Sequence, residues 1–407
     1  MNEPLWKHLD TPILSSAYWM SQGIDTHTSV ALETFQCQLC DRKFLNSSVI
    51  YIEPQVPNVI ITHQDILKLH WIKYIQRLIE VGRVTAFFVE RFQLNLPIID
   101  VIVPSLLQMP YIKELGLCNC NVDTNGLLLL AKNLKQNNTL KRLLLNENQI
   151  VDVDVANELS HAIEHHPTLQ ELCISHCGIG TNEHILPSIL NGCSNLKILR
   201  LNENNISSKN ITHIGEFLSC NPMLSCLRLD RNLLVDDDAK HLAEALSTNS
   251  NLQYLYIKGN DFTDTGKEQL MRTVMDTTSL NSIAESNHEC EIVFNESVAT
   301  SYINDKYWSR KRKVQYKTLL TLYGMSKETP VIHYFNEIPL ELIPHVLELI
   351  QTELACLEKH DAPSFIVENE PRQLLTRMFC FLRELPCLYA GETQQLLPDK
   401  QMIDDSR

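Results

Sequence analysis

The sequence predicts an α/β fold in which repeated units stack into a curved solenoid, with a parallel sheet on the concave side and helices on the outer side. Three observations predict it. A pattern of spaced leucines recurs about every 28 residues through the middle of the chain. The leucines of each copy alternate as in a short strand, and an amphipathic helical segment follows each copy. One such unit cannot bury its own apolar side, so neighbouring units must stack and share a core.

Two nearly identical stretches show the repeat directly: LKRLLLNENQI begins at Leu140 and LKILRLNENNI begins at Leu196. Their common pattern is L-x-x-L-x-L-x-x-N, with Cys as an alternative to Asn. It starts six times in phase, at Ile112, Leu140, Leu169, Leu196, Leu224 and Leu252. The L-x-L core places two leucines on one side of a strand. The side chain of the Asn or Cys can satisfy backbone groups where the chain turns away from the strand.

The segments between the predicted strands have the pattern of helices. An apolar residue comes two places after each Asn or Cys, at Val122, Ile150, Ile179, Ile206, Leu234 and Phe262. One of the segments that follow is DDDAKHLAEALSTN, in which Leu242 and Leu246 lie on one helical face. The acidic residues at 236–238 suit the start of that helix, where the helix dipole favours negative charge.

This pattern resembles the leucine-rich repeat, and its long period with helical outer segments resembles the ribonuclease-inhibitor-like class of that family. The resemblance covers residues 84–290 and implies a horseshoe-shaped solenoid with a parallel concave sheet and outer helices, flanked by helical caps. Proteins that resemble this class act mostly as protein-binding scaffolds, so the resemblance also implies a protein partner and no small-molecule cofactor. The repeat spacing is specific for the fold and not for the function.

We expect three regions: an N-terminal region with a capping helix (1–83), the solenoid (84–290), and a C-terminal helical cap with a polar tail (291–407). The stretch QDILKLHWIKYIQRLIE predicts the capping helix, with an apolar face formed by Ile66, Leu69, Ile72, Ile75 and Ile79. Terminal repeats are expected to be atypical. The first repeat accordingly has aromatic residues among its apolar slots, which are Val84, Phe87, Val89 and Phe92.

The C-terminal end of the solenoid is less regular in sequence. A last, irregular unit is expected 28 residues after Leu252, with its slots at Leu280, Ile283, Glu285 and His288. Beyond it, apolar spacing predicts three helices, near residues 307–325, 339–358 and 371–389. Pro339 and Pro371 suit helix starts, because proline is favoured at the first helical position.

Composition and charge restrict the class of function. The 407 residues are 44% apolar and 21% charged, as in a soluble globular protein. Their formal net charge of −14 argues against nucleic acid as a partner, because binding to phosphate backbones needs clustered Lys and Arg. No run approaches 18 consecutive apolar residues, so we expect no membrane span.

The cysteines and the first residues bear on the compartment. Thirteen cysteines, an odd number without framework spacing, fit reduced thiols. The stretch MNEPLWKHLDTPILSS lacks the basic start and the apolar run of a secretory signal. We therefore expect a cytoplasmic protein, with the nucleus as the alternative.

Three motifs suggest chemistry, and each has a plainer interpretation that we favour. FQCQLCDRKF, with Cys37 and Cys40, is similar to the first half of a two-Cys two-His zinc finger, but no His follows at the required spacing. We favour the interpretation that Cys37 and Cys40 are two thiols in an N-terminal cap, and metal binding is left open. The basic run at 310–313 suits a nuclear-import signal or a phosphate site, or more simply the solvated start of a cap helix. We expect His165 and His166 in a solvated loop.

Sequence motifs of catalysis are missing. The chain has no G-x-x-x-x-G-K-[ST] and no G-x-G-x-x-G, which argues against a built-in nucleotide site. It has no H-E-x-x-H, and a catalytic triad cannot be placed from spacing because triads are defined by geometry. We therefore predict no catalytic residues, no cofactor and no resident metal.

The repeat register predicts which side chains project from the concave sheet. The residue between the two core leucines of each strand gives a central row: Phe88, Gly116, Leu144, Cys173, Arg200, Arg228 and Tyr256. Arg and Tyr are enriched at binding hot spots, because they combine contact area with hydrogen bonding. At the C-terminal end of the sheet we expect a partner-binding cluster formed by Arg200, Arg228, Asp230, Arg231, Tyr254 and Tyr256.

The predicted function is a non-enzymatic scaffold that binds a partner protein through the concave face. The alternative is a GTPase activator that resembles the Ran GTPase-activating proteins, which share this repeat class and would accelerate hydrolysis in trans. The strongly acidic tail typical of that family is missing, since the chain ends in MIDDSR. A third hypothesis is a substrate adaptor, because IPLELIPHVLELI has an F-box-like opening, but the later part of that motif is not evident.

Overall fold

The structure is a computed structural model, and it describes residues 13–40, 47–54, 64–276, 278, 280–294, 313 and 317. The chain divides into two compact units. The first comprises Met1–Val274 and Glu289–Asn304, and it contains every strand described below. The second comprises Met275–His288 and Asp305–Arg407.

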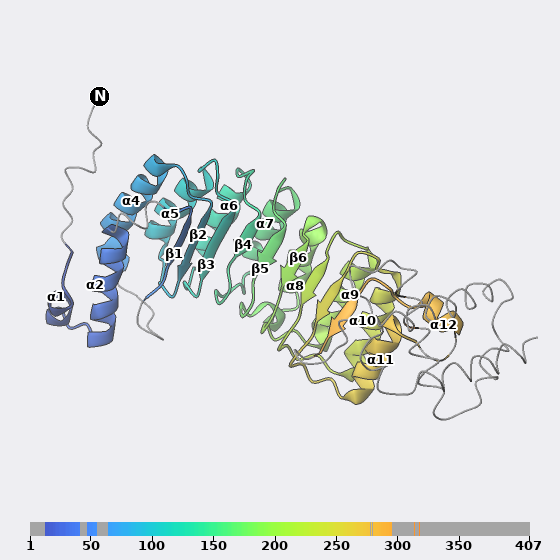
Figure 1. Ribbon diagram of the computed structural model, residues 1–407. Helices are drawn as coiled ribbons and strands as arrows, with labels where there is room; N and C mark the ends of the chain where they lie inside the picture. Colours follow the sequence, from blue (N-terminus) through green and yellow to red (C-terminus); the bar gives the residue numbers. More distant parts are fainter. Residues whose placement is uncertain are drawn as a thin grey trace, which may run out of the picture. The chain divides into compact units, whose positions relative to one another are not determined.

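The strands of the first unit form a single sheet. Within the described residues it has nine strands, which pair in sequence order and are all parallel (Figure 1). They are β1 (Val49–Ile52), β2 (Ala86–Glu90), β3 (Glu114–Cys118), β4 (Arg142–Leu144), β5 (Glu171–Cys173), β6 (Ile198–Arg200), β7 (Cys226–Arg228), β8 (Tyr254–Tyr256) and β9 (Glu291–Val293). Equivalent positions of successive repeats face one another, as Leu143 faces Leu172 and Leu199 faces Leu227.

Helices connect the strands and pack against one another in sequence order along one side of the sheet (Figure 1). They are α4 (Gln64–Val81), α5 (Leu96–Leu107), α6 (Thr124–Leu134), α7 (Val153–Glu164), α8 (Ile185–Asn191), α9 (Ser208–Ser219), α10 (Asp236–Thr248) and α11 (Asp264–Val274). Short 3-10 turns, Ile179–Thr181 and Cys193–Asn195, flank α8. Helices α1 (Ser16–Ser21) and α2 (Thr26–Cys40) precede β1. In the described part of the chain, no helix combines the length and the apolar character that crossing a bilayer requires.

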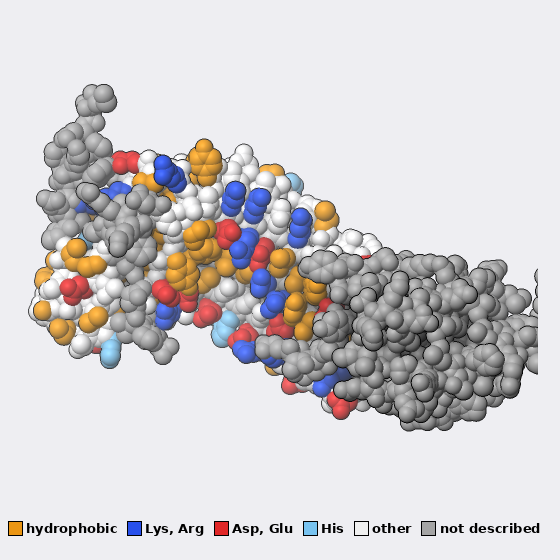
Figure 2. Space-filling model, in the orientation of Figure 1, with side chains coloured by type: hydrophobic (Ala, Val, Ile, Leu, Met, Phe, Trp, Pro, Cys, Tyr) orange, Lys and Arg blue, Asp and Glu red, His pale blue; other side chains and the backbone are white. Residues whose placement is uncertain are grey.

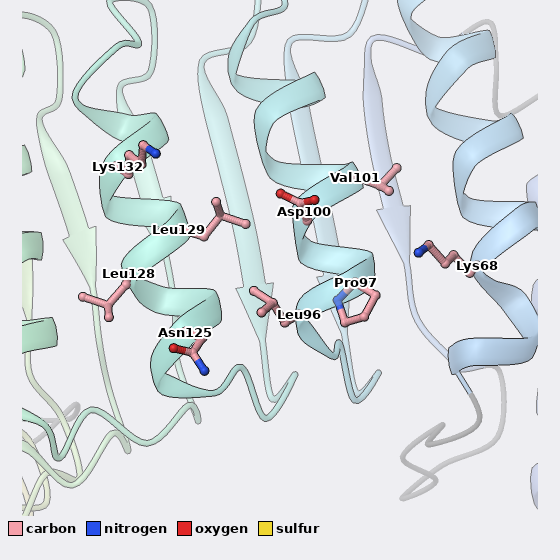
Figure 3. A pocket seen from close by; sticks show the side chains of 9 residues that line it. All are labelled: Lys68, Leu96, Pro97, Asp100, Val101, Asn125, Leu128, Leu129 and Lys132. Atoms are coloured by element: carbon pink, nitrogen blue, oxygen red, sulfur yellow. The ribbon is translucent and has the colours of Figure 1, made fainter.

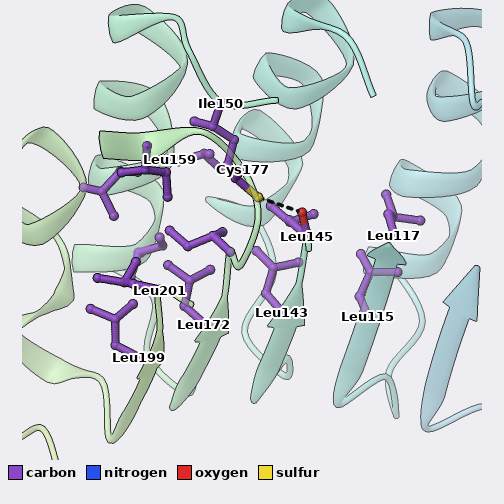
Figure 4. Packing of buried hydrophobic residues seen from close by; sticks show 14 of the residues in the cluster. Leu115, Leu117, Leu143, Leu145, Ile150, Leu159, Leu172, Cys177, Leu199 and Leu201 are labelled. Atoms are coloured by element: carbon purple, nitrogen blue, oxygen red, sulfur yellow. Dashed lines mark hydrogen bonds between the residues drawn. The ribbon is translucent and has the colours of Figure 1, made fainter. Parts of the chain in front are cut away.

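The apolar core lies between the sheet and the helices. Leu143, Leu199 and Leu255, the central leucines of three strands, have no solvent-exposed surface. Figure 4 shows the leucines of successive strands stacked in register, so that each unit covers the apolar edge of the one before. These positions confirm the predicted leucine-rich-repeat fold, an α/β solenoid with strands on one side and helices on the other.

A buried asparagine at the end of a strand joins each unit to its neighbour. The side-chain oxygen of Asn232 accepts the backbone N–H groups of Asn204 (2.9 Å) and Ile206 (3.1 Å). Its side-chain nitrogen donates to the backbone oxygens of Leu201 (3.0 Å) and Leu229 (2.9 Å). One amide therefore satisfies four backbone groups, three of which belong to the preceding repeat. Asn148, Asn204 and Asn260 bridge their repeats in the same way.

Two repeats carry cysteine at this position, and it replaces only part of the amide. The thiol of Cys177 donates to the backbone oxygen of Leu145 at 3.3 Å (Figure 4). The N–H of Ile150, which an Asn side chain would accept, bonds instead to the backbone oxygen of Cys177 at 2.9 Å. Cys120 repeats the arrangement, accepting the N–H of Leu94 on its own carbonyl at 2.9 Å. The cysteine repeats thus pair the same backbone groups with fewer side-chain bonds.

The residue before each of these Asn or Cys positions, and before Phe92 in the first repeat, has a left-handed backbone, with φ between 51° and 71°. Only one of the seven is glycine, although an L-residue pays about 1–2 kcal/mol for this conformation. The turn that carries the bridging amide therefore imposes strain in nearly every repeat. The seven residues form a row along the carboxyl edge of the strands: Arg91, Asn119, Glu147, His176, Glu203, Arg231 and Gly259.

The loops from helix to strand contain a second set of buried polar side chains. His166 is one of them, so the prediction that it is solvated was wrong. His166 is 7% exposed rather than solvated. Its Nδ1 accepts the backbone N–H groups of Thr168 and Leu169, so Nε2 carries the proton that faces the side-chain oxygen of Asn137 at 3.3 Å. Asn137 caps the equivalent loop of the preceding repeat. The neighbouring His165 is exposed, as expected.

The N-terminal helix was predicted in the right place, and its predicted apolar face was right for Ile75 but wrong for Leu69 and Ile79. The buried apolar residues described in α4 are Trp71, Tyr74, Ile75 and Leu78, whereas Leu69 and Ile79 are about half exposed. Trp71 packs edge-on against Phe92, at 6.0 Å between ring centroids, and near Phe35 of α2. The larger aromatic surfaces of Trp71 and Tyr74 therefore decide which face turns inward, because burying them removes more apolar area from water.

The sheet is longer at both ends than the leucine pattern indicated. Strand β1 lies before residue 84 and β9 lies after residue 290. The last irregular unit was predicted wrongly, because residues 280–285 form helix α12 (Leu280–Glu285) of the second unit rather than a strand. The strand that pairs with β8 is Glu291–Val293, which places Ile292 opposite Leu255. The predicted helices beyond residue 305 lie outside the described residues, apart from Lys313 and Lys317.

We predict that Asn232→Ala lowers the free energy of unfolding by about 3 kcal/mol, because three buried backbone groups of the preceding repeat lose their partner, while the oxygen of Leu229 keeps its bond from Asn260. Urea denaturation followed by circular dichroism measures the change. The matched control, Asn125→Ala, removes an exposed amide at the start of α6 and should change stability by less than about 0.5 kcal/mol. Equal effects of the two substitutions would show that the bridging amide does not hold the repeats together.

Burial lowers the pKa of His166 from 6.5 to about 4. The folded state therefore favours the neutral imidazole, and the associated stability is complete above pH 6.5 and is lost as the pH falls from 6.5 toward 4. We expect a loss of about 2 kcal/mol over this range, measured by urea denaturation at several pH values. The variant His166→Asn should lose this pH dependence, since Asn137 caps the equivalent loop. His165→Asn should keep it.

Candidate functional site

The candidate site is the side of the sheet that faces away from the helices, called here the open face. Its side chains come from β1 to β8, at the positions that alternate with the buried core residues. Figure 2 shows Lys, Arg, Asp and Glu side chains together in the middle of this side, with hydrophobic side chains on either side of them. The open face therefore has a charged centre between two apolar areas.

The charged centre is a ladder of alternating charges that crosses four strands. Arg142 Nη1 of β4 lies 2.9 Å from Glu114 Oε2 of β3, and Arg142 Nε lies 2.9 Å from Glu171 Oε2 of β5. Arg200 Nε of β6 then lies 2.9 Å from Glu171 Oε1. Each residue belongs to a different repeat, 28 or 29 positions from the next. The equal length of the repeats therefore brings these charges together.

Glu171 is the central residue of the ladder. Its side chain is only 8% exposed, and each of its oxygens meets a different arginine. The thiol of Cys173 donates to the same carboxylate at 3.4 Å. Burial, together with the negative charge of Glu171, raises the pKa of Cys173 to about 12, so this thiol is protonated and unreactive at neutral pH. Glu171 thus fixes two guanidinium groups and one thiol.

Beyond Arg200 the ladder continues into an aromatic area on β7 and β8. The guanidinium carbon of Arg228 lies 4.0 Å from the centre of the Tyr256 ring, which is a cation–π contact. Tyr256 stacks near Tyr254, with ring centroids 6.2 Å apart. Among the described residues, the closest carboxylate oxygen to Arg228 is Oδ2 of Asp230, at 4.0 Å. Burial raises the pKa of Asp230 above the ordinary value of a carboxyl, although the N–H of Lys258 donates to it at 3.0 Å.

The structure brings five of the six predicted site residues together on three neighbouring strands and the turns that follow them. Arg200, Arg228 and Tyr256 occupy facing positions of β6, β7 and β8. Arg231 is separate, because it belongs to the left-handed row at the carboxyl edge, where it pairs with Glu203 at 3.0 Å. Both of those side chains are well exposed. The role of all six in binding stays a prediction.

Sequence reasoning missed the residues that hold the predicted ones in place. Glu114, Arg142 and Glu171 occupy the slot before the first core leucine of three successive repeats, where their charges alternate in sign. That alternation was the available signal. The sequence alone does not show that these charges meet. Their contact depends on how far each side chain reaches across the spacing between strands, which is about 4.8 Å.

The other apolar area of the open face lies on β1 and β2. The ring of Tyr51 lies 6.1 Å from that of Phe88, and its hydroxyl donates to Glu90. Phe88 lies over Gly116 of the next strand, where a Cβ atom would come within 2.5 Å of the Phe88 ring. Because glycine has no side chain, Gly116 leaves room for the Phe88 ring to lie against its strand.

The helix side also has a hollow, which is a competing candidate. It is an open groove of about 670 Å³ across α4, α5 and α6. Figure 3 shows Lys68 and Lys132 at its two sides with Asp100 between them, over an apolar floor that includes Leu96 and Leu129. The groove lacks the network of mutual contacts that orders the side chains of the open face.

The remaining sequence motifs add no built site. Cys37 is exposed on α2, and the side chain of Cys40 lies outside the described residues. Among the side chains that are described, no three His, Cys, Asp or Glu residues are placed to hold a metal ion. The basic run at 310–313 is described only at Lys313, so its role stays a prediction, as does that of the metal site.

Comparisons with known proteins bear on the fold alone. No family model matches the sequence, and no curated protein matches it. Solved structures with some similarity include the leucine-rich-repeat-containing protein LegL7 from Legionella pneumophila, at 17% identity and a TM-score of 0.39, covering 56% of this chain and 78% of that one. Another is a protein from Bacteroides fragilis, at 14% identity and a TM-score of 0.35, covering 64% of this chain and 70% of that one. The fold assignment rests on the register of the repeats themselves.

We predict that Glu171→Gln lowers the free energy of unfolding by about 2 kcal/mol, because it leaves Arg142 and Arg200 facing an uncharged and nearly buried side chain. Chemical denaturation of the full chain measures the loss. In the matched control, Glu158→Gln, the exposed ion pair with Lys135 is removed, and stability should hardly change. If Glu171→Gln is equally silent, the ladder does not order the open face.

Proposed function

We propose that this chain is a protein-binding scaffold whose open face recognises a partner protein. The observation that carries the proposal is that charged and aromatic side chains of several repeats are held to one another on the open face. The opposite side of the sheet is occupied by helices and core. Extended surfaces of this kind are how repeat proteins bind other proteins.

Prior ordering of these side chains supports the proposal. Arg142 and Arg200 are fixed by Glu171, and Arg228 is fixed by Tyr256. Side chains that are ordered before binding lose less conformational entropy when a partner arrives, at a saving of about 0.5–1.5 kcal/mol for each one. Such contacts would contribute more to affinity than those of mobile surface residues.

The residue types on the open face also suit a protein partner. Arg228, Tyr254 and Tyr256 combine partly exposed apolar area with hydrogen-bonding groups, which is typical of residues at the centre of interfaces. Leu144 and Ile198 are partly exposed among the charged residues. A partner with a mixed apolar and polar surface would fit this pattern better than a polyanion, given the net charge of −14.

The test compares the two sides of the solenoid. The full chain is immobilised, and co-purifying proteins are measured by quantitative mass spectrometry. We expect Leu144→Ala combined with Tyr256→Ala to reduce capture of the main partner at least about tenfold, as for loss of a hot-spot residue. The control, Lys68→Ala combined with Lys132→Ala at the helix-side groove, should leave capture unchanged. Urea denaturation checks that both variants remain folded.

Two outcomes would contradict the proposal. Loss of capture in the groove variant, with normal capture in the open-face variant, would place the interaction on the helix side. If the captured protein is a small GTPase, its GTP hydrolysis is measured with and without the full chain. Acceleration of that hydrolysis would replace the scaffold by a GTPase activator, which acts catalytically in trans.

A further inference from the structure

The alternation of charges on the open face is broken at one step. From Glu114 to Arg200 each charge pairs with an opposite one on the next strand, and Glu171 reaches Arg200 diagonally because its facing residue is Ile198. At β6 and β7, however, Arg200 faces Arg228 directly in the register of the sheet. Like charges at facing positions of neighbouring strands destabilise a sheet, so this step costs folding energy in the free protein.

Among the described residues, neither arginine of this pair has a close carboxylate to itself. Arg200 shares Glu171 with Arg142, and the contact uses its Nε, leaving the outer guanidinium nitrogens available. Arg228 comes no closer than 4.0 Å to Asp230, whose other oxygen accepts the N–H of Lys258. The side chains of Arg200 and Arg228 are each about one-third exposed. Both can therefore be reached from solvent.

We propose that Arg200 and Arg228 together clamp one side-chain carboxylate of a partner protein. This inference rests on the proposed function and names the chemistry of the partner segment at that face. Two guanidinium groups at facing positions of adjacent strands offer several N–H donors to a carboxylate bound between them, and arginines bind carboxylates through such charge-assisted hydrogen bonds. A bound carboxylate would also remove the repulsion between the two arginines.

The local charge favours a single carboxylate over a phosphate or a run of acidic residues. Glu171 and Asp230 lie beside the clamp and would repel a dianion more strongly than a monoanion. The net charge of −14 repels a long acidic segment. The partner is therefore expected to offer one Glu or Asp in an otherwise uncharged stretch.

The tyrosines beside the clamp define the neighbouring residue of the partner. Tyr254 and Tyr256 present a stacked aromatic surface on the next strand. In an extended segment, residues two apart point to the same side and are separated by about 6.6 Å, which is enough to cross the spacing of about 4.8 Å between β7 and β8. A partner segment of the form Glu-x-apolar would place its carboxylate on the arginines and its apolar side chain on the tyrosines.

The test uses synthetic peptide mixtures and the full chain. The first mixture has the form x-x-Glu-x-Leu-x-x, where x is Ser, Thr, Asn or Gly, and the others carry Gln or phosphoserine in place of Glu. Fluorescence polarisation measures their affinities. We expect the Glu mixture to bind about tenfold more tightly than the Gln mixture, consistent with one charge-assisted contact. Arg228→Gln should abolish this difference, and the control Arg231→Gln should retain it.

Three results would overturn the clamp. These are equal binding of the Glu and Gln mixtures, no binding by any mixture, and tighter binding of the phosphoserine mixture, which would indicate a phosphate site. The scaffold proposal fails separately. If Leu144→Ala with Tyr256→Ala abolishes capture of the partner while Arg228→Gln leaves it unchanged, the open face binds a partner without the clamp. If none of these substitutions affects capture, both proposals fail.

Discussion

The structure depends on the hydrogen bonds by which one buried side chain joins each repeat to the preceding one. Strands β4 to β8 have three residues each, so each forms few backbone hydrogen bonds with its neighbours. The amides of Asn148, Asn204, Asn232 and Asn260 supply the additional bonds at the point where each strand ends. Because every amide acts at the same position of its repeat, it also fixes the register in which successive strands pair.

That register produces the chemistry of the open face. A strand that slipped by one residue would turn its core leucine outward and its charged residue inward. With the register fixed, slots 27 to 29 residues apart in sequence become neighbours across the sheet, and Glu114, Arg142 and Glu171 meet as a ladder. The same rule places Arg200 beside Arg228 and Arg228 beside Tyr256. An interaction surface thus arises from residues that are never close together along the chain.

Much of the fold could be predicted from the sequence, because leucine spacing reports the strand and helix pattern directly. The residues of the open face could be predicted for the same reason. The contacts among these residues could not be predicted. They depend on how far each side chain reaches and on one group pairing with two others, as the carboxylate of Glu171 pairs with Arg142 and Arg200. His166 was expected to be solvated because its role, an imidazole in the place of a capping amide, has no signal in spacing. The faces of α4 and the position of β9 depend on packing at the ends of the solenoid, where no neighbouring repeat constrains the pattern.

The central claim, that a partner protein binds the open face, is tested most directly by hydroxyl-radical footprinting of the chain with and without its captured partner. The account predicts that the partner reduces the oxidation of Tyr254 and Tyr256, which are partly exposed on β8. Oxidation of Tyr111, which is 59% exposed before β3, should not change. Protection of residues on the helix side, with normal oxidation of both β8 tyrosines, would contradict the account.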